Sequence, residues 1–298
     1  MAPARTEGWC ENVAGTDTLA RRLWKAIEPI HAVVYFASEP AEAARANGLK
    51  GWWMGYFAGR VAPAGPLGPG AAQALFFAFP PRRVSRALPD AWSFAAPEKI
   101  LRGHMEAAQA ALERTLPPVE PPELERLVVL LERAVQGCGY EGRALAAAWA
   151  SVPRPAALVG RLWLAATVLR EHRGDGHVVA LVHAGLNGVE AGMTHVATGD
   201  VARDVIQTSR GWTDEEWDRA RERLAARGLL DADGGLTERG HALRLTVEED
   251  TDRLAAEPVT HLGREGVEEA IRLAVPLSRH LIDSGVIPMP NPIGVPRP

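Results

Sequence analysis

The sequence predicts a mostly helical protein in which one structural unit occurs twice, with a small β-hairpin in the second copy. Short motifs recur in the same order at a nearly constant offset, apolar residues recur at helical spacing, and an Asp-Gly turn lies between apolar residues. Hydrophobic residues make up 47% and charged residues 23% of the 298-residue chain, which is the balance of an ordinary globular protein.

The internal repeat is the first of these observations. Most of the matched motifs lie 137 residues apart and one lies 139 residues apart, a regularity that chance rarely produces for motifs in one order. The matched residues are Arg22-Leu23-Trp24 with Arg161-Leu162-Trp163; Gly48, Leu49, Gly51 and Gly55 with Gly185, Leu186, Gly188 and Gly192; Arg82 and Arg86 with Arg219 and Arg223; and Arg102-Gly103-His104 with Arg239-Gly240-His241.

We therefore expect a first copy over residues 15–155, a second copy over residues 156–287 and a proline-rich tail over residues 288–298. Pro153 and Pro155 mark the boundary between the copies. Five prolines follow Ile287, so the tail cannot form a helix or a central strand. We expect it to lie along the surface or to dock as an extended arm.

The second copy shows helical spacing most clearly. Apolar residues predict a helix over residues 158–171, which we expect the glycine at 174 to interrupt. Asp175 is then the expected N-cap of a new helix over residues 177–184, because its carboxylate can accept free amide hydrogens there. Further short helices are expected over residues 188–197 and 201–208.

A capped helix and a wing complete the second copy. Thr213, with Glu216 three residues on, forms a capping box that opens a long helix. Leu230, an Asp-Gly turn and Leu236 predict the small hairpin, and Thr237 caps the last long helix. This order of elements is that of a winged-helix-like, helix-turn-helix unit. In the first copy, prolines leave barely two helical turns for the long helix, and the wing is nearly absent.

The second copy resembles the winged-helix core of MarR-type regulators, through Leu224–Leu230 and Leu236–Gly240. The whole chain also resembles a helix-turn-helix family of actinobacteria, through Arg22–His31, Arg170–Leu181 and Ser209–Trp217. The MarR resemblance implies a DNA-binding transcriptional regulator that holds its ligand near the junction of its dimerisation and DNA-binding parts.

The charges disfavour DNA as a partner. A net charge of -4 gives no overall attraction to nucleic acid. The expected recognition helix would present acids to the DNA phosphates at its first turns, namely Asp214, Glu215, Glu216 and Asp218. The first copy is more basic, and its candidates for contact with DNA are Arg82, Arg83 and Arg86.

The most unusual segment runs from Arg170 to His177, where charged and polar groups crowd the expected helix junction. Glu28 and His31 stand at the equivalent junction of the first copy, so a pseudo-twofold axis would bring two glutamate–histidine pairs together. Two adjacent glutamates need an arginine, a metal or a proton between them. The candidate ligand-binding residues are Glu28, His31, Tyr35, Trp53, Arg170, Glu171, His172, Arg173, Asp175 and His177.

Several kinds of ligand suit this set of residues. His31 and His177 with nearby carboxylates suit a divalent metal or an acid/base catalyst, and the two histidines could also bracket a tetrapyrrole. Arginines can clamp ligand carboxylates, and Tyr35 and Trp53 offer aromatic walls. The alternative is that these are ordinary capping and hydrogen-bonding residues that hold no ligand.

The remaining features indicate a cytoplasmic protein without membrane contact. Cys10 and Cys138 fit no metal or redox spacing and suit a reducing compartment. The N-terminus lacks an apolar segment of signal-peptide length, and the most apolar run, residues 71–80, is too short to span a bilayer.

Three functions follow from these features. The sequence favours a small-molecule-binding protein that holds a flat, aromatic or anionic ligand in the cleft between the two copies. The second function is a ligand-responsive DNA-binding transcriptional regulator. The third is a metal- or acid/base-dependent enzyme that uses the glutamate and histidine cluster.

Overall fold

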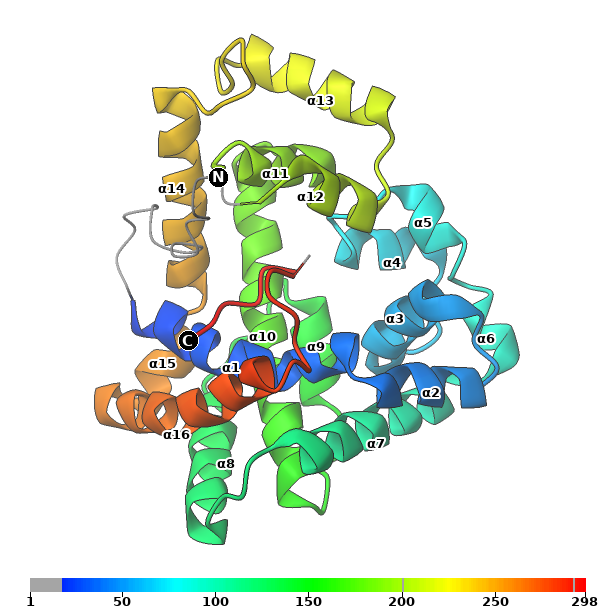
Figure 1. Ribbon diagram of the computed structural model, residues 1–298, viewed down its shortest axis with the longest axis vertical. Helices are drawn as coiled ribbons and strands as arrows, with labels where there is room; N and C mark the ends of the chain where they lie inside the picture. Colours follow the sequence, from blue (N-terminus) through cyan, green and yellow to red (C-terminus); the bar gives the residue numbers. More distant parts are fainter. Residues whose placement is uncertain (1–17, 200, 292) are drawn as a thin grey trace, which may run out of the picture.

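The computed structural model describes residues 18–199, 201–291 and 293–298. Cys10 and the first three residues of the expected first copy lie outside the described residues. Within the described ranges the chain is mostly helical (Figure 1). The first half forms α1 (Leu19–Phe36), α2 (Ser38–Ala46), α3 (Gly51–Val61), the 3-10 helix η1 (Ala62–Ala64), α4 (Pro69–Leu75), α5 (Pro81–Ser85), α6 (Ala91–Phe94), α7 (Pro97–Thr115), α8 (Pro121–Val135) and α9 (Ala144–Ala150).

The second half begins with the longest helix, which passes through the middle of the molecule (Figure 1). The helices of this half are α10 (Leu158–His183), α11 (Gly188–Val196), α12 (Arg203–Arg210), α13 (Asp214–Ala226), α14 (Glu238–Leu254), α15 (Glu257–Leu262) and α16 (Arg264–Asp283).

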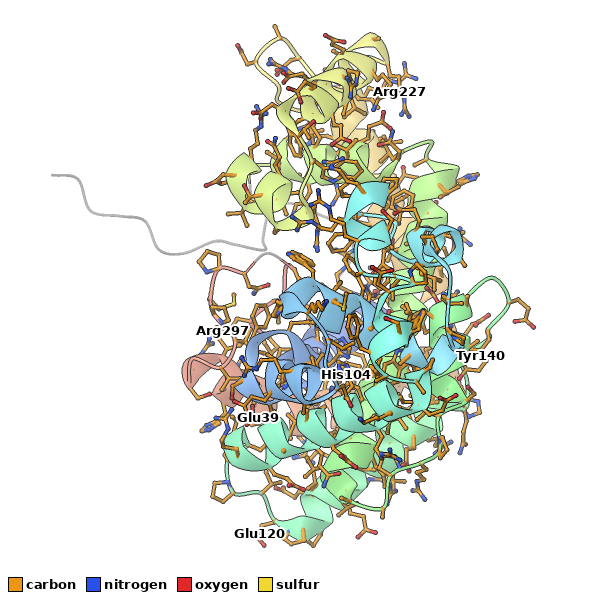
Figure 2. The ribbon with its side chains drawn as sticks, turned by 90° about the vertical axis from the view of Figure 1, so that its right-hand side faces the viewer. Glu39, His104, Glu120, Tyr140, Arg227 and Arg297 are labelled. Carbon is orange, nitrogen blue, oxygen red and sulfur yellow. The ribbon has the colours of Figure 1, made fainter. Side chains whose placement is uncertain are left out.

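Two hydrophobic cores share α10. The larger core lies among α1, α3, α7, α8, α16 and the N-terminal half of α10, where Trp149 and Trp163 are fully buried. The smaller core lies among the C-terminal half of α10 and α11 to α14, around Trp217 and Leu224. Figure 2 shows the two parts as neighbouring lobes, with Arg227 at the far end of the smaller one. A space between the lobes is therefore walled by α10.

The continuity of α10 corrects the expected break at Gly174. Glycines weaken a helix but do not end it when neighbouring elements pack against it. Gly176 leaves space for Arg143, whose Nη1 lies 2.7 Å from where a Cβ would stand and donates to the carbonyl of His172. The glycine thus serves a close approach between two elements. Likewise, Glu28 and His31 lie within α1 and not at a helix junction.

Asp175 caps a different helix from the one expected. Its Oδ2 accepts the amide hydrogens of Leu145 and Ala146 at 3.0 and 2.9 Å, which caps α9 instead of a helix beginning at His177. Burial raises the pKa of Asp175 to about 6, although these two amides lower it. The sequence identifies a capping residue here, but not the helix that it caps.

The predicted hairpin wing is reduced to a tight turn. The described residues contain no strand, and the wing is represented by one antiparallel bridge between Leu230 and Leu236. The carboxylate of Asp231 accepts the amides of Asp233 and Gly235, both at 2.9 Å, which closes the turn at once. With α13 and α14 starting so close on either side, no residues are left to extend a ladder.

The two expected copies share one turn in detail. Gly48 after α2 and Gly185 after α10 both have positive φ, of 81° and 66°. In both turns the next residue donates a 3.0 Å hydrogen bond to the carbonyl five residues earlier, Leu49 to Ala44 and Leu186 to Leu181. In both copies the next helix starts three residues after this glycine, at Gly51 in α3 and at Gly188 in α11.

The Arg-Leu-Trp match has no such counterpart in the structure. Trp163 is 1% exposed in the larger core, whereas Trp24 is half-buried at the edge of a cavity. The helices of residues 20–115 and 159–252 nevertheless follow in the same order, except that α1 and α2 stand where α10 stands alone. A tandem duplication stays a prediction, and so do the boundaries drawn from it.

The proline-rich tail docks against the larger core. Ile287 and Val295 are 1% and 2% exposed, and the side chain of Asn291 accepts the amide of Val295 at 2.9 Å. The described residues of the tail contain no helix or strand, in agreement with their proline content.

Candidate functional site

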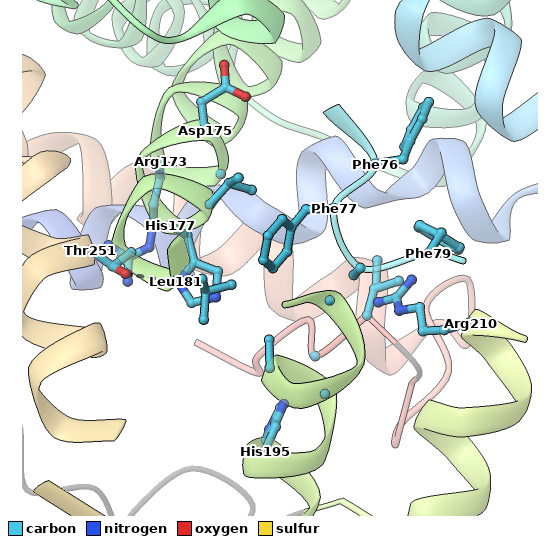
Figure 3. Close-up of a pocket in the computed structure, with 18 of the residues that line it drawn as sticks. Phe76, Phe77, Phe79, Arg173, Asp175, His177, Leu181, His195, Arg210 and Thr251 are labelled. Atoms are coloured by element: carbon cyan, nitrogen blue, oxygen red, sulfur yellow. Dashed lines mark hydrogen bonds between the residues drawn. The ribbon is translucent and has the colours of Figure 1, made fainter. Parts of the chain in front are cut away.

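A cavity of about 370 Å³ lies between the two cores, a volume near the small end of the range for ligand pockets. We call it the charged cavity. Its wall comes from α1, α3, α10, α11, α12 and α14, from the loop between α4 and α5, and from the tail at Ile293 and Gly294. Figure 3 shows Phe77 of that loop facing His177 and Leu181 of α10, with Arg210 beside Phe79.

A buried ion cluster forms one end of the charged cavity. Arg60 of α3 donates to both carboxylate oxygens of Glu171, at 2.9 and 2.8 Å, and Arg170 donates to the same carboxylate at 3.0 Å. Burial acts to raise the pKa of Glu171, but Arg170 and Arg60 hold it down at about 2. Glu171 is therefore ionised and fixes both guanidinium groups at the cavity wall.

Arg170 also lies between two carboxylates. Its Nε is 3.4 Å from Oε1 of Glu28, whose other oxygen accepts the indole N–H of Trp24 at 2.8 Å. The expectation that an arginine would separate Glu28 from Glu171 is confirmed. The two glutamates converge through this arginine and not through a metal.

A third arginine adds positive charge to this end. Burial lowers the pKa of Arg210, and the nearby guanidinium groups of Arg60 and Arg170 lower it further. Arg210 stacks over the ring of Phe79 at 4.8 Å, and Arg60 donates to the hydroxyl of Tyr56 at 3.1 Å. Three guanidinium groups thus gather around two glutamates, and a bound anion would reduce their mutual repulsion.

An aromatic wall adjoins the arginines. The ring of Tyr56 lies 5.9 Å from Phe76 and 5.8 Å from Phe79, and Phe77 and Trp212 line the cavity further along. Rings at these separations offer faces and edges on which a flat ligand can stack. The cavity therefore joins an apolar, aromatic surface to a cationic end.

The opposite end carries a neutral histidine. Thr251 of α14 donates its hydroxyl hydrogen to the carbonyl of Val247 at 2.6 Å, so it accepts from Nδ1 of His177, which lies 2.9 Å away. The lone pair of His177 is then on Nε2. Burial lowers the pKa of His177 to about 4, which keeps the ring uncharged at neutral pH.

Six of the ten candidate residues line the charged cavity, and four do not. The lining residues are Glu28, Tyr35, Arg170, Arg173, Asp175 and His177. Glu171 lies behind the arginines that it holds. His172 faces away, with Nε2 3.6 Å from Glu257.

His31 and Trp53 also lie outside the cavity. His31 is buried behind Tyr35, with Nδ1 2.9 Å from Thr167 and Nε2 2.9 Å from the hydroxyl of Tyr35. Both of its ring nitrogens are engaged, so it does not pair with His177 around a ligand. In the described part of the chain no three histidine, cysteine or acidic side chains gather as a metal site. Trp53 stacks on Phe57 at 5.8 Å within the aromatic cluster.

Sequence reasoning missed several lining residues because they come from distant segments. Arg60 was visible only as a basic residue near the expected DNA-contacting arginines, and Tyr56 only as part of an aromatic pattern. No local pattern links Arg210, Arg244 or Thr251 to Arg170. The missed residues include Tyr56, Arg60, Phe76, Phe77, Phe79, Arg210, Trp212, Arg244, Glu248 and Thr251.

Two helices beside the cavity meet at a short turn. Gly211 ends α12 in the left-handed conformation, and α13 begins at Asp214 after a reciprocal capping box. The hydroxyl of Thr213 accepts the amide of Glu216 at 3.2 Å, and the carboxylate of Glu216 accepts the amide of Thr213 at 2.9 Å. Two helices joined by a three-residue turn with glycine form a helix-turn-helix.

The comparison with known families decides the identity of this arrangement. The model of a helix-turn-helix family matches residues 20–288. The chain belongs to this helix-turn-helix family. No curated protein and no solved structure matches the chain.

In this helix-turn-helix protein, the basic residues of the first copy serve the contact between lobes. Arg82 donates to both carboxylate oxygens of Glu216, at 2.6 and 2.8 Å. Arg83 donates to the carbonyl of Ser209 at 2.9 Å and stacks over Trp53 at 4.3 Å. Only Arg86 of the three candidates stays exposed without such a role in the described structure. These contacts fasten α5 to the helix-turn-helix turn.

The exposed face of α13 carries both charges. Arg221 donates to the carbonyl of Ala232 in the turn after α13, and Arg223 pairs with Glu190 at 2.7 Å. The other exposed charges on this face are mostly acidic, namely Asp214, Glu215, Asp218, Arg219 and Glu222. The face therefore lacks a basic patch that would attract phosphates. Among the described helices, none is long and apolar enough to cross a membrane.

Proposed function

We propose that the protein binds a small anionic, aromatic molecule in the charged cavity between its two lobes. One observation carries the proposal: the buried guanidinium groups of Arg60, Arg170 and Arg210 gather at one end of a cavity walled by aromatic rings. Flat apolar surface binds a ring, and convergent arginines bind a carboxylate or a similar anion. We further propose a duplicated, MarR-like winged-helix scaffold as the origin of the two-lobed arrangement, which the shared turns at Gly48 and Gly185 support.

A ligand of one or two rings suits the charged cavity better than a tetrapyrrole. The cavity volume of about 370 Å³ is near the lower limit for ligand pockets, and His31 is not placed to flank a macrocycle. His177 offers Nε2 as a hydrogen-bond acceptor at the far end, so a ligand with a donor opposite its anionic group fits the polarity of the site.

Titration with an aromatic carboxylate tests this proposal. Calorimetry with 2-naphthoate should show one site per chain, and Arg210→Gln should weaken the affinity by about tenfold or more, because a charge-assisted hydrogen bond is lost. Arg86→Gln removes the same charge from an exposed position and should leave the affinity unchanged. Equal affinities in both variants would overturn the arginine cluster as the site.

The second candidate is a ligand-responsive DNA-binding regulator, favoured by membership in the helix-turn-helix family. The acids on α13 and the engagement of Arg82 and Arg83 argue against tight contact of this face with DNA. Anisotropy titrations with duplex DNA, with and without 2-naphthoate, separate the two candidates, since only a regulator would show a ligand-dependent affinity.

A further inference from the structure

A second cavity of about 300 Å³ lies in the first copy, between α2 and α3. We call it the apolar cavity. Tyr35 of α1 and His104 of α7 line it from the core side, and Trp52 of α3 stands at its mouth. Nothing in the function proposed above uses this cavity.

The apolar cavity and the charged cavity occupy matching places in the two copies. Five residues that line the apolar cavity map, at the same offset of 137 residues, onto five that line the charged cavity. The pairs are Pro40 with His177, Ala41 with Val178, Ala44 with Leu181, Gly51 with Gly188, and Gly55 with Gly192. Both sets frame the left-handed glycine turn that the copies share, at Gly48 and at Gly185.

This correspondence has a structural cause. The turn fixes how one helix ends and the next begins, and its hydrogen bonds are the same in both copies. Gly55 allows close packing of α3 on α2, because an added Cβ would stand 2.8 Å from the Cβ of Ala44. The space left beside the paired helices is therefore a property of the repeated backbone and not an irregularity of one loop.

The side chains around the apolar cavity select a different ligand. In place of arginines, it is lined mainly by aliphatic and aromatic groups, with Arg45 on an exposed position at the rim. Burial lowers the pKa of His104 to about 4, so this histidine is neutral. An uncharged molecule can enter such a space without the cost of burying an unpaired charge.

An aromatic shelf stands at the mouth of the apolar cavity. Trp52 is 46% exposed, and its ring stacks on Tyr56 at 5.2 Å with an interplanar angle of 15°. An exposed tryptophan beside a cavity offers a ring face to a planar ligand. Tyr35 and Tyr56 line both cavities and form the partition between them.

From this correspondence we propose that the apolar cavity is a second binding site, for an uncharged aromatic molecule, separate from the anion site of the charged cavity. The protein then holds two ligands of different charge at equivalent places of its two copies. This site does not depend on the anionic ligand proposed above.

A pair of matched fluorescent probes tests the second site. N-phenyl-naphthylamine is uncharged, and anilinonaphthalene sulfonate is the same ring system with an anionic group. Matched variants come from the repeat: Ala41→Phe fills the apolar cavity and Val178→Phe fills the charged cavity, and both positions are half-buried. Each probe should bind the wild-type protein once per chain, and both should bind together.

In Ala41→Phe, the Kd of the uncharged probe should rise about tenfold or more, because the added ring occupies the space it needs, while the Kd of the anionic probe should not change. Val178→Phe should show the opposite pattern. Loss of the uncharged probe in Val178→Phe but not in Ala41→Phe would overturn the second site. Failure of the anionic probe alone would count against the charged cavity and leave the second site standing.

Trp52→Ala covers the case in which Ala41→Phe does not fold, which near-ultraviolet circular dichroism would reveal. This variant removes the exposed shelf without filling the core. It should weaken the uncharged probe severalfold and leave the anionic probe unchanged, and equal binding of the uncharged probe to this variant and the wild type would also contradict the proposal.

Discussion

The charged cavity and the apolar cavity share a backbone plan but differ in chemistry. His177, Val178 and Leu181 line one, and Pro40, Ala41 and Ala44 stand at the matching positions of the other. The glycine turns are alike because only glycine adopts positive φ there without strain. Side chains that face a cavity have no such constraint, so their charges can diverge while the turn is kept.

The largest difference should appear when the buried anion of the charged cavity is removed. Glu171→Gln leaves Arg60 and Arg170 buried without their main counter-charge, which should lower the free energy of unfolding by about 3–5 kcal/mol. Urea denaturation measures this loss. Glu39→Gln is the control, because Glu39 pairs with Arg114 at the surface and should cost about 1 kcal/mol or less. Similar losses in both variants would show that the cluster contributes no more than a surface pair.

Acid should destabilise both cavities through their histidines. The pKa of His104 and that of His177 are both lowered by burial to about 4, below the ordinary value of 6.5. The unfolded chain therefore binds more protons between pH 4 and 6.5, and stability should fall as the pH drops through this window.

Replacing His177 with glutamine should reduce that loss of stability by about 2–3 kcal/mol between pH 6.5 and 4, as judged from urea midpoints. Asp175 acts in the opposite sense, because its raised pKa of about 6 makes the folded state bind more protons between the ordinary value of 3.8 and 6. Asp175→Asn should accordingly steepen the fall of stability toward acid pH. A His177→Gln variant with the wild-type pH profile would mean that this histidine is charged in the fold.

The shared turn predicts equal effects in the two copies. Gly48→Ala and Gly185→Ala should each lower the free energy of unfolding by about 1–2 kcal/mol, because alanine is strained at positive φ. Thermal melting of the two variants compares them directly. Gly70→Ala, in α4 with open space around its Cβ and no positive φ, should be neutral or slightly stabilising. A clear loss in only one of the two copies would break the structural equivalence.

The smallest expected effect concerns DNA. Binding to duplex DNA should be weak, sensitive to salt and independent of sequence, because the face of α13 carries acids and Arg82 is engaged by Glu216. Arg82→Ala should therefore leave anisotropy titrations with DNA nearly unchanged. Nanomolar binding to one sequence at physiological salt, lost on changing Arg82, Arg83 or Arg86, would show that the basic residues of the first copy read DNA after all.

Local features of this protein followed from the sequence alone. The capping box of Thr213 and Glu216, the cap at Thr237, the short first-copy helix at α5 and the non-helical tail were all predicted correctly. These features depend on residues within a few positions of each other, since a cap or a proline acts on its own turn of backbone.

The tertiary structure alone decided which side chains share a cavity. Gly174 and Gly176 read locally as a break, but packing from Arg143 and the surrounding helices keeps α10 continuous. That continuity turns His177 toward the charged cavity and leaves His31 behind Tyr35, so the predicted pair of histidines does not form. Arg60 and Glu171 meet across 111 residues, and no sequence spacing encodes a contact that exists only once α3 packs beside α10. Local rules thus set the turns and caps, whereas the cavity depends on how burial arranges distant helices.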